Sequence, residues 1–261
     1  MKCLSSKIQS HKTSALLRIW VWWQIGIHVT CGICTLSFLF PFLSRRNKDR
    51  KIQEWSKRIL KIFNIELVVQ GAGLLHHTPH LIASNHVSWL DIHVINAFQP
   101  IRFVAKSEVA GWPIFGWMAK QLGTVFIRRD SARHARQVVG QMAEVLKTES
   151  ICIFPEGTST AGVTVLPFKP NLFESAILAQ VPVFPLAIQY LSKVTGERSE
   201  SPAFIGDMGL LESMSNIIKN RSLMVKITIL NPYLSDAQST PDRKNLANDC
   251  QDAIAKSLKA A

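Results

Sequence analysis

The feature that most constrains this 261-residue chain is a run of 25 residues, from Ile19 to Leu43, without any Asp, Glu, Lys or Arg. As a helix this run would be roughly 37 Å long, enough to cross a bilayer core of about 30 Å. Its first residues include three tryptophans, which suit a membrane interface: Trp20, Trp22 and Trp23. The run is too long for a signal-peptide core and no small-x-small cleavage site follows it. We therefore expect a membrane-associated helical element that stays in the mature chain.

The sequence leaves open how this run meets the membrane. Basic residues lie on both sides of it, so the positive-inside rule gives no orientation: Lys2, Lys7, Lys12 and Arg18 before it, and Arg45, Arg46, Lys48, Arg50 and Lys51 after it. A single crossing helix is one interpretation. A helix hairpin in one leaflet is the other, with Pro41 and either Gly26 or Gly32 as its weak points.

Positive charge is concentrated around the apolar run. The chain has 30 Lys and Arg against 18 Asp and Glu, a net charge of +12. Residues 1–63 hold 12 of these basic residues against Asp49 and Glu54, a net of +10, which leaves +2 for the other 198 residues. A nucleic-acid-binding protein would place its basic residues on its main domain. We therefore expect membrane lipid as the partner and no nucleic acid.

The basic segment 48–63 has apolar residues at helical i, i+3 and i+4 spacings: Ile52, Trp55, Ile59, Ile62 and Phe63. A basic amphipathic helix is typical of a membrane surface. We expect this helix to lie at the membrane interface, and packing against the rest of the chain is the alternative.

Composition excludes two other classes of protein. Apolar residues make up 47% of the chain and charged residues 18%, which excludes intrinsic disorder. Five cysteines are too few for a disulfide framework and indicate a reduced, cytosol-facing protein. Cys31 and Cys34 form a CxxC pair, but they lie inside the apolar run without a second ligand pair. We interpret them as ordinary helix residues and expect no metal site.

After Gly71, short β-rich runs alternate with helical segments, which predicts an α/β fold with a mostly parallel or mixed sheet flanked by helices. We divide the chain into a membrane-associated helical region, 1–64, and an α/β domain, 65–261. The predicted strands are 66–70, 80–84, 101–105, 124–128, 150–154, 183–189 and 223–230. The predicted helices are 89–98, 113–122, 132–147, 172–179, 210–220 and a last helix that Thr240 and Pro241 open.

The first motif is Asn85-His86-Val87-Ser88-Trp89-Leu90-Asp91, which directly follows an apolar strand. Ser88 and Asp91 have the spacing of a capping box at the start of a helix. His86 is close enough in sequence for Asp91 to accept its ring N–H, which would make the imidazole a general base of defined tautomer. The capping role alone is the simpler alternative for Asp91.

Three further segments carry candidate chemistry. Phe154-Pro155-Glu156-Gly157-Thr158 follows a strand, and Gly157 permits a loop whose backbone N–H groups converge on an anion, with a plain turn as the alternative. Gly123-Thr-Val-Phe-Ile-Arg128-Arg129 ends a strand in two arginines, which suit phosphate or, more simply, solvent. Val181-Pro-Val-Phe-Pro185-Leu186 is a proline-containing apolar run typical of an edge or kinked strand.

In this order and spacing, the four blocks resemble the glycerolipid acyltransferase family, which contains the lysophosphatidic acid acyltransferases. The resemblance spans roughly residues 81–186. NHxxxxD, GxxFIxR and FPEGT together are far more specific than any one of them, and the connecting segments FVAKSE (103–108) and PIFG (113–116) also look like those of the family.

The resemblance implies transfer of a fatty acyl group from acyl-CoA or acyl-carrier protein to the free hydroxyl of a lysophospholipid, with lysophosphatidic acid as the leading acceptor in phospholipid biosynthesis. It implies His86 as the base that deprotonates this hydroxyl and Asp91 as the residue that orients it. It implies substrate-binding roles for Arg129, Glu156, Gly157, Thr158 and Lys106. No cofactor, metal or acyl-enzyme nucleophile is implied, and the expected location is the membrane, at the cytoplasmic face of the inner membrane in a bacterium.

Two departures from the family pattern bear on the acceptor. Position 128 is Arg where the family often has Asp or Lys, and Lys169 is followed by Pro170 where many members have glycine. Lyso-ornithine lipid, or another lysolipid, is therefore an alternative acceptor. A non-catalytic lipid-binding protein is a second alternative. A serine hydrolase is disfavoured because the chain has no GxSxG motif.

Overall fold

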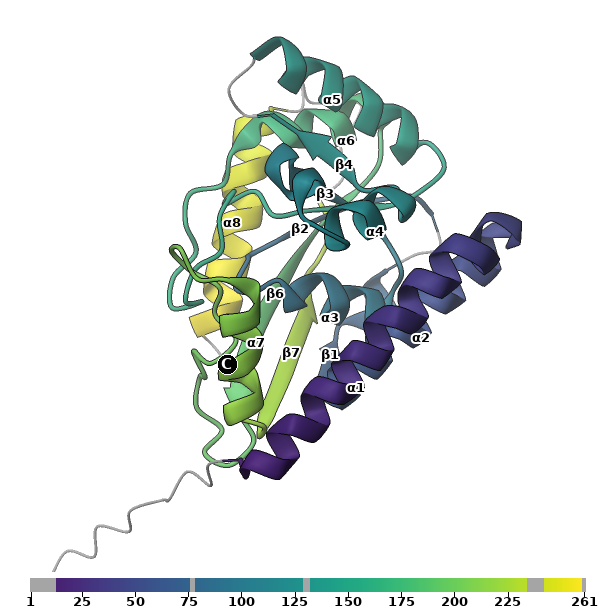
Figure 1. Ribbon diagram of the computed structural model, residues 1–261. Helices are drawn as coiled ribbons and strands as arrows, with labels where there is room; N and C mark the ends of the chain where they lie inside the picture. The colour runs from purple at the N-terminus through teal and green to yellow at the C-terminus, as the bar shows by residue number, and fades with distance from the viewer. Residues whose placement is uncertain (1–12, 76–77, 129–131, 234–241, 260–261) are drawn as a thin grey trace, which may run out of the picture.

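A computed structural model describes residues 13–75, 78–128, 132–233 and 242–259. Within these ranges one seven-stranded mixed sheet lies between two layers of helices (Figure 1), which confirms the predicted α/β class. The strand order is β1-β7-β6-β2-β5-β3-β4. The strands are β1 (Ile65–Gln70), β2 (Leu81–Ser84), β3 (Arg102–Lys106), β4 (Val125–Ile127), β5 (Ile151–Ile153), β6 (Val183–Ser192) and β7 (Leu223–Ile229).

Each face of the sheet has its own hydrophobic cluster. One cluster joins the sheet to α1 (Ala15–Cys34), α2 (Arg45–Ile62), α3 (Leu90–Phe98) and α7 (Leu210–Lys219). The other joins it to α5 (Ala132–Leu146), α6 (Glu174–Ala179) and α8 (Arg243–Lys259), and the short α4 (Phe115–Gln121) lies between β3 and β4 in the chain. All four residues of β2 are buried, Ile82 toward the first cluster and Leu81 and Ala83 toward the second. Burial on both faces is why this strand is an unbroken apolar run.

The direction of the strands brings several motifs to one edge of the sheet. β2, β5, β3 and β4 are mutually parallel neighbours, and β6 is parallel to β2 but antiparallel to β7. The carboxyl ends of these parallel strands therefore meet at the same edge, where open α/β sheets place ligand sites.

β6 is an internal strand, so of the two expectations from its prolines, an edge strand or a kinked strand, the edge strand was wrong. Pro185 pairs with Ala83 of β2 and lies one residue before the antiparallel ladder with β7 begins at Leu186. Its carbonyl accepts a hydrogen bond from Leu230 N–H at 3.0 Å. The proline is tolerated because it stands at the end of a ladder, where one missing donor breaks no run of paired residues.

The N-terminal helices form a hairpin, and Figure 1 shows α1 and α2 side by side along one flank of the molecule. α1 is unbroken at Gly26 and Gly32, and the chain reverses after it through a π-helical turn (Thr35–Leu39) and a 3-10 turn (Phe40–Phe42) that contains Pro41. The stretch Ala15–Phe42 is long and apolar enough to cross a membrane by length and composition. One stripe of α1 is buried against the protein: Val21, Ile25, His28 and Gly32.

The expectation that the apolar face of the segment 48–63 lies in the membrane interface was wrong. This segment lies within α2 and Phe63 that follows it, and α2 packs against α3 and β1 with Ser56, Ile59, Leu60 and Ile62 buried. Burial against the α/β domain removes more apolar area from water than a shallow position in the membrane interface would. The apolar face of α2 therefore packs on the domain. The hairpin and the domain thus share one hydrophobic cluster, and the boundary after residue 64 coincides with the start of β1.

The last helix begins later than predicted. Thr240 and Pro241 lie outside the described residues, and α8 begins at Arg243. The Asp242 carboxylate accepts the Lys244 N–H at 3.0 Å and so caps this helix.

Gly71 provides a test of the packing between β1 and β7. It has φ +73°, and a Cβ at this position would lie 2.3 Å from the Ile229 carbonyl oxygen. We expect Gly71→Ala to lower the free energy of unfolding by roughly 2–4 kcal/mol, because the positive φ and the backbone clash both cost energy. Gly73→Ala is the matched control, since that site has open space. Thermal melting in detergent measures both, and equal losses would contradict the argument.

Candidate active site

The loops that follow β2 and β5 carry two of the motifs and lie next to each other, because these strands are adjacent and parallel. His86 follows β2 and Glu156 follows β5. Lys106 is the last residue of β3, and Arg128 follows β4. Neighbouring strands are about 4.8 Å apart, so the end of β4 lies roughly 14 Å from the end of β2 along this edge.

Asn85 ties the start of the first motif to β6. Its amide nitrogen donates to the Ile188 carbonyl at 3.0 Å, and its amide oxygen accepts the Ile188 N–H at 2.7 Å. This pair satisfies buried backbone groups of β6 just beyond the point where β2 ends. The loop therefore leaves the sheet in a defined direction.

The predicted pairing of His86 with Asp91 is present. His86 Nδ1 lies 2.8 Å from Asp91 Oδ2, and the same oxygen accepts the N–H groups of Val87 at 2.7 Å and Ser88 at 3.0 Å. Ser88 Oγ in turn accepts the Leu90 N–H at 3.3 Å. The expected capping box is present only in part. The Ser88 N–H donates to Asp91, as in such a box, but Ser88 Oγ accepts from Leu90 and not from Asp91, and α3 begins one residue later, with Trp89 before its first turn. One carboxylate therefore holds both the backbone of its loop and the His86 ring.

The Asp91 carboxylate is fully buried, and its second oxygen is also bonded. Oδ1 accepts a hydrogen bond of 2.7 Å from the hydroxyl of Tyr190, on β6. A buried carboxylate keeps its charge only where donors replace water. Here four donors replace water around Asp91. The pKa of Tyr190 lies well above its ordinary value, mainly because the phenol is buried and also because the Asp91 charge is nearby.

The His86 ring lies where a base must lie, between the buried carboxylate and solvent. Its side chain is 22% exposed, and the ring stacks on Phe154 with 4.1 Å between centroids. Because Nδ1–H donates to Asp91, the lone pair of the neutral ring is on Nε2. This geometry therefore leaves Nε2 as the ring atom that can accept a proton.

The second motif holds the backbone of His86 on both sides. The Glu156 carboxylate accepts the His86 N–H at 2.7 Å, and the Thr160 N–H donates to the His86 carbonyl at 2.9 Å. The other Glu156 oxygen accepts the Leu166 N–H at 2.8 Å. Glu156 is 4% exposed, and burial raises its pKa, although both backbone N–H groups oppose that effect. These contacts assign Glu156 to positioning His86, and its contact with substrate stays a prediction.

The other predicted site residues are less closely placed. Gly157 has φ +76°, and its N–H donates to the Phe154 carbonyl at 3.0 Å, so that N–H closes a turn. Thr158 and Lys106 are exposed, at this edge of the sheet. Arg129 lies outside the described residues.

Two contributors to the site were missed at the level of sequence: Tyr190 and Thr160. Tyr190 had a usable signal, because a tyrosine within a buried strand requires a hydrogen-bond partner for its hydroxyl. Thr160 had little, since its shorter contact with the His86 carbonyl is made by the backbone N–H, which every residue except proline has, and its hydroxyl adds a longer bond of 3.4 Å.

The described residues offer neither a thiolate nucleophile nor a cluster of metal ligands. Cys152, on β5, is fully buried, and burial, followed by the Asp91 charge, raises the pKa of its thiol well above the ordinary value. Within the described ranges, no three or more His, Cys, Asp or Glu side chains gather in a way that could hold a metal ion.

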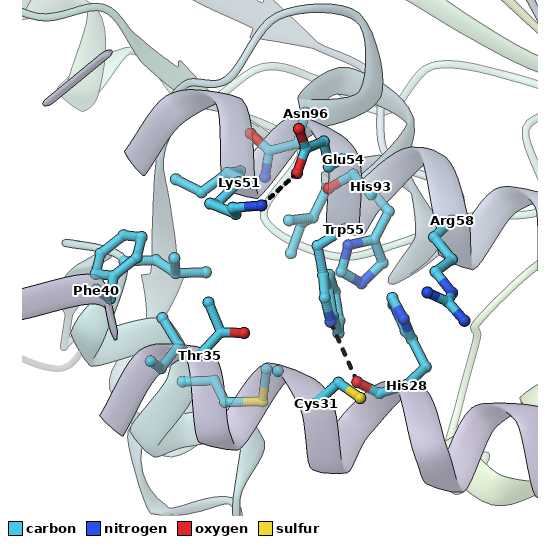
Figure 2. Close-up of a pocket in the computed structure, with 17 residues that line it drawn as sticks. His28, Cys31, Thr35, Phe40, Lys51, Glu54, Trp55, Arg58, His93 and Asn96 are labelled. Carbon is cyan, nitrogen blue, oxygen red and sulfur yellow. Dashed lines mark hydrogen bonds and ion pairs between the residues drawn. The ribbon is translucent and has the colours of Figure 1, made fainter. Parts of the chain in front are cut away.

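A pocket of about 240 Å³ lies between the hairpin and the helix that carries Asp91 (Figure 2). α3 contributes Ile92, His93 and Asn96 to it, so it adjoins the loop that carries His86, although neither His86 nor Asp91 lines it. Figure 2 shows the rings of Trp55, His28 and His93 grouped together. Trp55 stacks on His28 with 4.3 Å between centroids and meets His93 edge-on at 5.1 Å. The far end of the pocket is apolar, lined by Leu36, Phe40, Ile52, Met118 and Leu122.

Comparison with known proteins shows the family of the chain. The family model described as Acyltransferase matches residues 66–189, which include both motifs. The 1-acyl-sn-glycerol-3-phosphate acyltransferase of Neisseria meningitidis is 33% identical over 209 residues, 80% of each chain. The lyso-ornithine lipid O-acyltransferase of Pseudomonas aeruginosa is 35% identical over 212 residues, 81% of this chain and 79% of that one.

The fold also has a solved counterpart. The crystal structure of the 1-acyl-sn-glycerophosphate acyltransferase PlsC from Thermotoga maritima has a TM-score of 0.67 at 20% identity and covers 94% of each chain. With sequence identity this low, the likeness concerns the fold. The family match, the two relatives and the motifs together lead to one conclusion: this chain is an enzyme of the glycerolipid acyltransferase family.

Proposed function

We propose that this enzyme transfers a fatty acyl group from an acyl thioester to the free hydroxyl of a lysolipid, with lysophosphatidic acid as the leading acceptor. The observation that carries the proposal is the 2.8 Å contact between His86 Nδ1 and Asp91 Oδ2, beside a ring that reaches solvent. A base of this kind suits the deprotonation of an alcohol.

The proposed reaction is a direct attack on the thioester. His86 Nε2 takes the proton of the acceptor hydroxyl as its oxygen bonds to the thioester carbonyl carbon. The tetrahedral intermediate then collapses, the carbon–sulfur bond breaks, and the thiolate takes the proton from the imidazolium. Asp91 stabilises the imidazolium between these steps. A thioester is already activated, so neither a cofactor nor an acyl-enzyme is needed.

Charge at the edge of the sheet favours a phosphate-bearing acceptor. Three exposed cations lie at this edge: Lys106 at the end of β3, Arg128 after β4, and Lys169 beside the second motif. The Lys169 N–H donates to the Pro155 carbonyl, which holds Lys169 next to that motif. A phosphate monoester gains more from such cations than a zwitterionic headgroup does. Lyso-ornithine lipid is the second candidate acceptor, and the similarity to the Pseudomonas aeruginosa enzyme supports it.

The same cations suit acyl-CoA or acyl-carrier protein as the donor, since both carry phosphate. Hydrocarbon chains of the substrates suit the apolar end of the pocket behind α3.

We further propose that the hairpin docks on a membrane at its cytoplasmic face. One face of α1 and the turn after it exposes large apolar side chains: Leu16, Leu17, Ile19, Trp20, Trp23, Ile27, Phe38, Leu39 and Phe42. The opposite stripe of α1 is buried against the protein, which favours a helix along one leaflet over a crossing helix. The described cysteines are free thiols, as suits a reducing compartment.

Acylation assays test the proposed function. Purified enzyme with radiolabelled acyl-CoA should acylate lysophosphatidic acid in preference to lyso-ornithine lipid and other lysolipids. His86→Ala should lower kcat by roughly 100- to 10,000-fold, the usual contribution of a general base, while the protein stays folded with a lower melting temperature, because Asp91 loses one of its donors. Product formation that survives His86→Ala would overturn the role of His86, and preference for another lysolipid would replace the acceptor.

Glu156→Gln separates positioning from substrate binding. The Gln amide has one acceptor oxygen where two backbone N–H groups need acceptors, so one of them, at His86 or Leu166, would face an NH₂ group. We expect kcat to fall roughly 10- to 100-fold with little change in the acceptor KM, since His86 loses its position. Glu144→Gln is the control. Among the described residues, the exposed Glu144 carboxylate forms an ion pair with Lys147 and with no other cation. A rise in KM alone would instead indicate contact with the acceptor.

Cosedimentation with vesicles of phosphatidylglycerol and phosphatidylethanolamine tests the docking face. Trp20 and Trp23 stack on each other, with 4.7 Å between ring centroids, and are half exposed. The double variant Trp20→Ser/Trp23→Ser should bind at least about 10-fold more weakly, because each ring would otherwise bury apolar area. Leu178→Ser, an exposed position on α6 across the sheet, should bind normally. Equal binding by the wild type, the double variant and Leu178→Ser would refute the assignment of α1 as the docking face.

A further inference from the structure

We propose that Tyr190 is a positioning residue of the active site, whose hydroxyl sets how strongly Asp91 holds His86 and thereby sets the pH range of the reaction. This inference rests on the proposed role of His86 as the base. It adds a third residue to the pair, from a strand about a hundred positions further along the chain.

The placement of Tyr190 follows from the length of β6. β6 pairs with β2 from Val183 to Leu186 and then continues beyond the end of β2 to Ser192, supported by β7. Ile188 receives the amide of Asn85, and Tyr190, two residues further along, points its hydroxyl at Asp91 Oδ1 at 2.7 Å. Residues two apart share a face of a strand. The strand thus holds the catalytic loop at its start and at its end.

The two oxygens of Asp91 have different partners. Oδ2 accepts three donors, His86 Nδ1 and the N–H groups of Val87 and Ser88, whereas Oδ1 accepts the Tyr190 hydroxyl. A hydrogen bond to one oxygen draws negative charge toward it and away from the other. Tyr190 therefore weakens the hold of Oδ2 on the protonated His86 ring.

The surroundings keep this donor in place. Tyr190 is 2% exposed, and burial raises its pKa well above the ordinary value, which favours the protonated phenol that donates to Asp91. The other titratable groups that face the pair come from β5 and the loop after it. They are Cys152, which interacts with the Asp91 charge, and Glu156, which interacts with both His86 and Asp91. Neither of them contacts Asp91 Oδ1 through a hydrogen bond among the described residues.

The test is the pH profile of Tyr190→Phe, which removes one oxygen atom. We expect the acid limb of the kcat/KM profile to move to higher pH by about 0.5–1 unit, because the protonated His86 ring is held more tightly. At neutral pH, kcat should fall about 3- to 10-fold with both KM values unchanged. Tyr233→Phe is the matched control: Tyr233 is the other of the two tyrosines, and its hydroxyl donates to the Asp249 carbonyl.

A stronger donor should act in the opposite sense. In the Tyr233→Phe background Tyr190 is the sole tyrosine, so fluorotyrosine fed during expression enters at this position alone. Fluorination makes the phenol more acidic and a better donor. The acid limb should then move to lower pH. This arm does not depend on the folding of Tyr190→Phe.

NMR titration of the His86 ring gives a readout that does not require turnover. Its midpoint should rise in Tyr190→Phe and fall with fluorotyrosine, with the His86 signal assigned by its loss in His86→Gln. If both the profile and the midpoint stay fixed while the melting temperature falls, Tyr190 is only structural and the inference is overturned. If the midpoint moves but the wild-type enzyme acylates no lysolipid, the inference stands and the proposed function fails.

Discussion

The buried Asp91 carboxylate is the interaction on which the site depends. It accepts two backbone N–H groups of its own loop, the ring of His86 and the hydroxyl of Tyr190. The same atoms therefore bend the loop between β2 and α3 and orient the imidazole. A charge at 0% exposure is costly unless each lone pair is used, and its donors come from two parts of the chain, the loop after β2 and β6. One carboxylate thus serves both the local fold and the proposed catalytic geometry.

The second motif supports the first. Glu156 and Thr160 hold the N–H and the carbonyl of His86, and Phe154 stacks on its ring. β2 and β5 are adjacent and parallel, so their loops leave the sheet together and can exchange these bonds. A rigid base of defined tautomer needs no reorganisation at the moment of proton transfer, which is how positioning contributes to catalysis. His86 is the proposed base, and the loops after β2 and β5 position it.

The hairpin links its exposed apolar face to the helix that carries Asp91. α2 packs on α3, and α1 packs on α2, with Trp55 of α2 in ring contact with both His28 of α1 and His93 of α3. At the other end of α2, Arg45 forms an ion pair with Glu149, which also pairs with Arg102 of β3 through two bonds of 2.7 Å. An exposed apolar face therefore stands at a defined distance from the site, as a reaction on a lipid acceptor requires.

The sequence alone determined the strands and helices, the α/β class, the bond from Ser88 N–H to Asp91 and the pairing of His86 with Asp91. Each depends on residues at most a few positions apart, where hydrophobic periodicity and capping patterns carry the information. The order of the strands was decided only by the tertiary structure, and with it the internal position of β6, the packing of α2 on α3, and the contacts of Glu156 and Tyr190. These contacts join residues 70 to about 100 positions apart, such as His86 with Glu156 and Asp91 with Tyr190. No local pattern specifies such a partner, because it depends on which strands become neighbours and how far each extends.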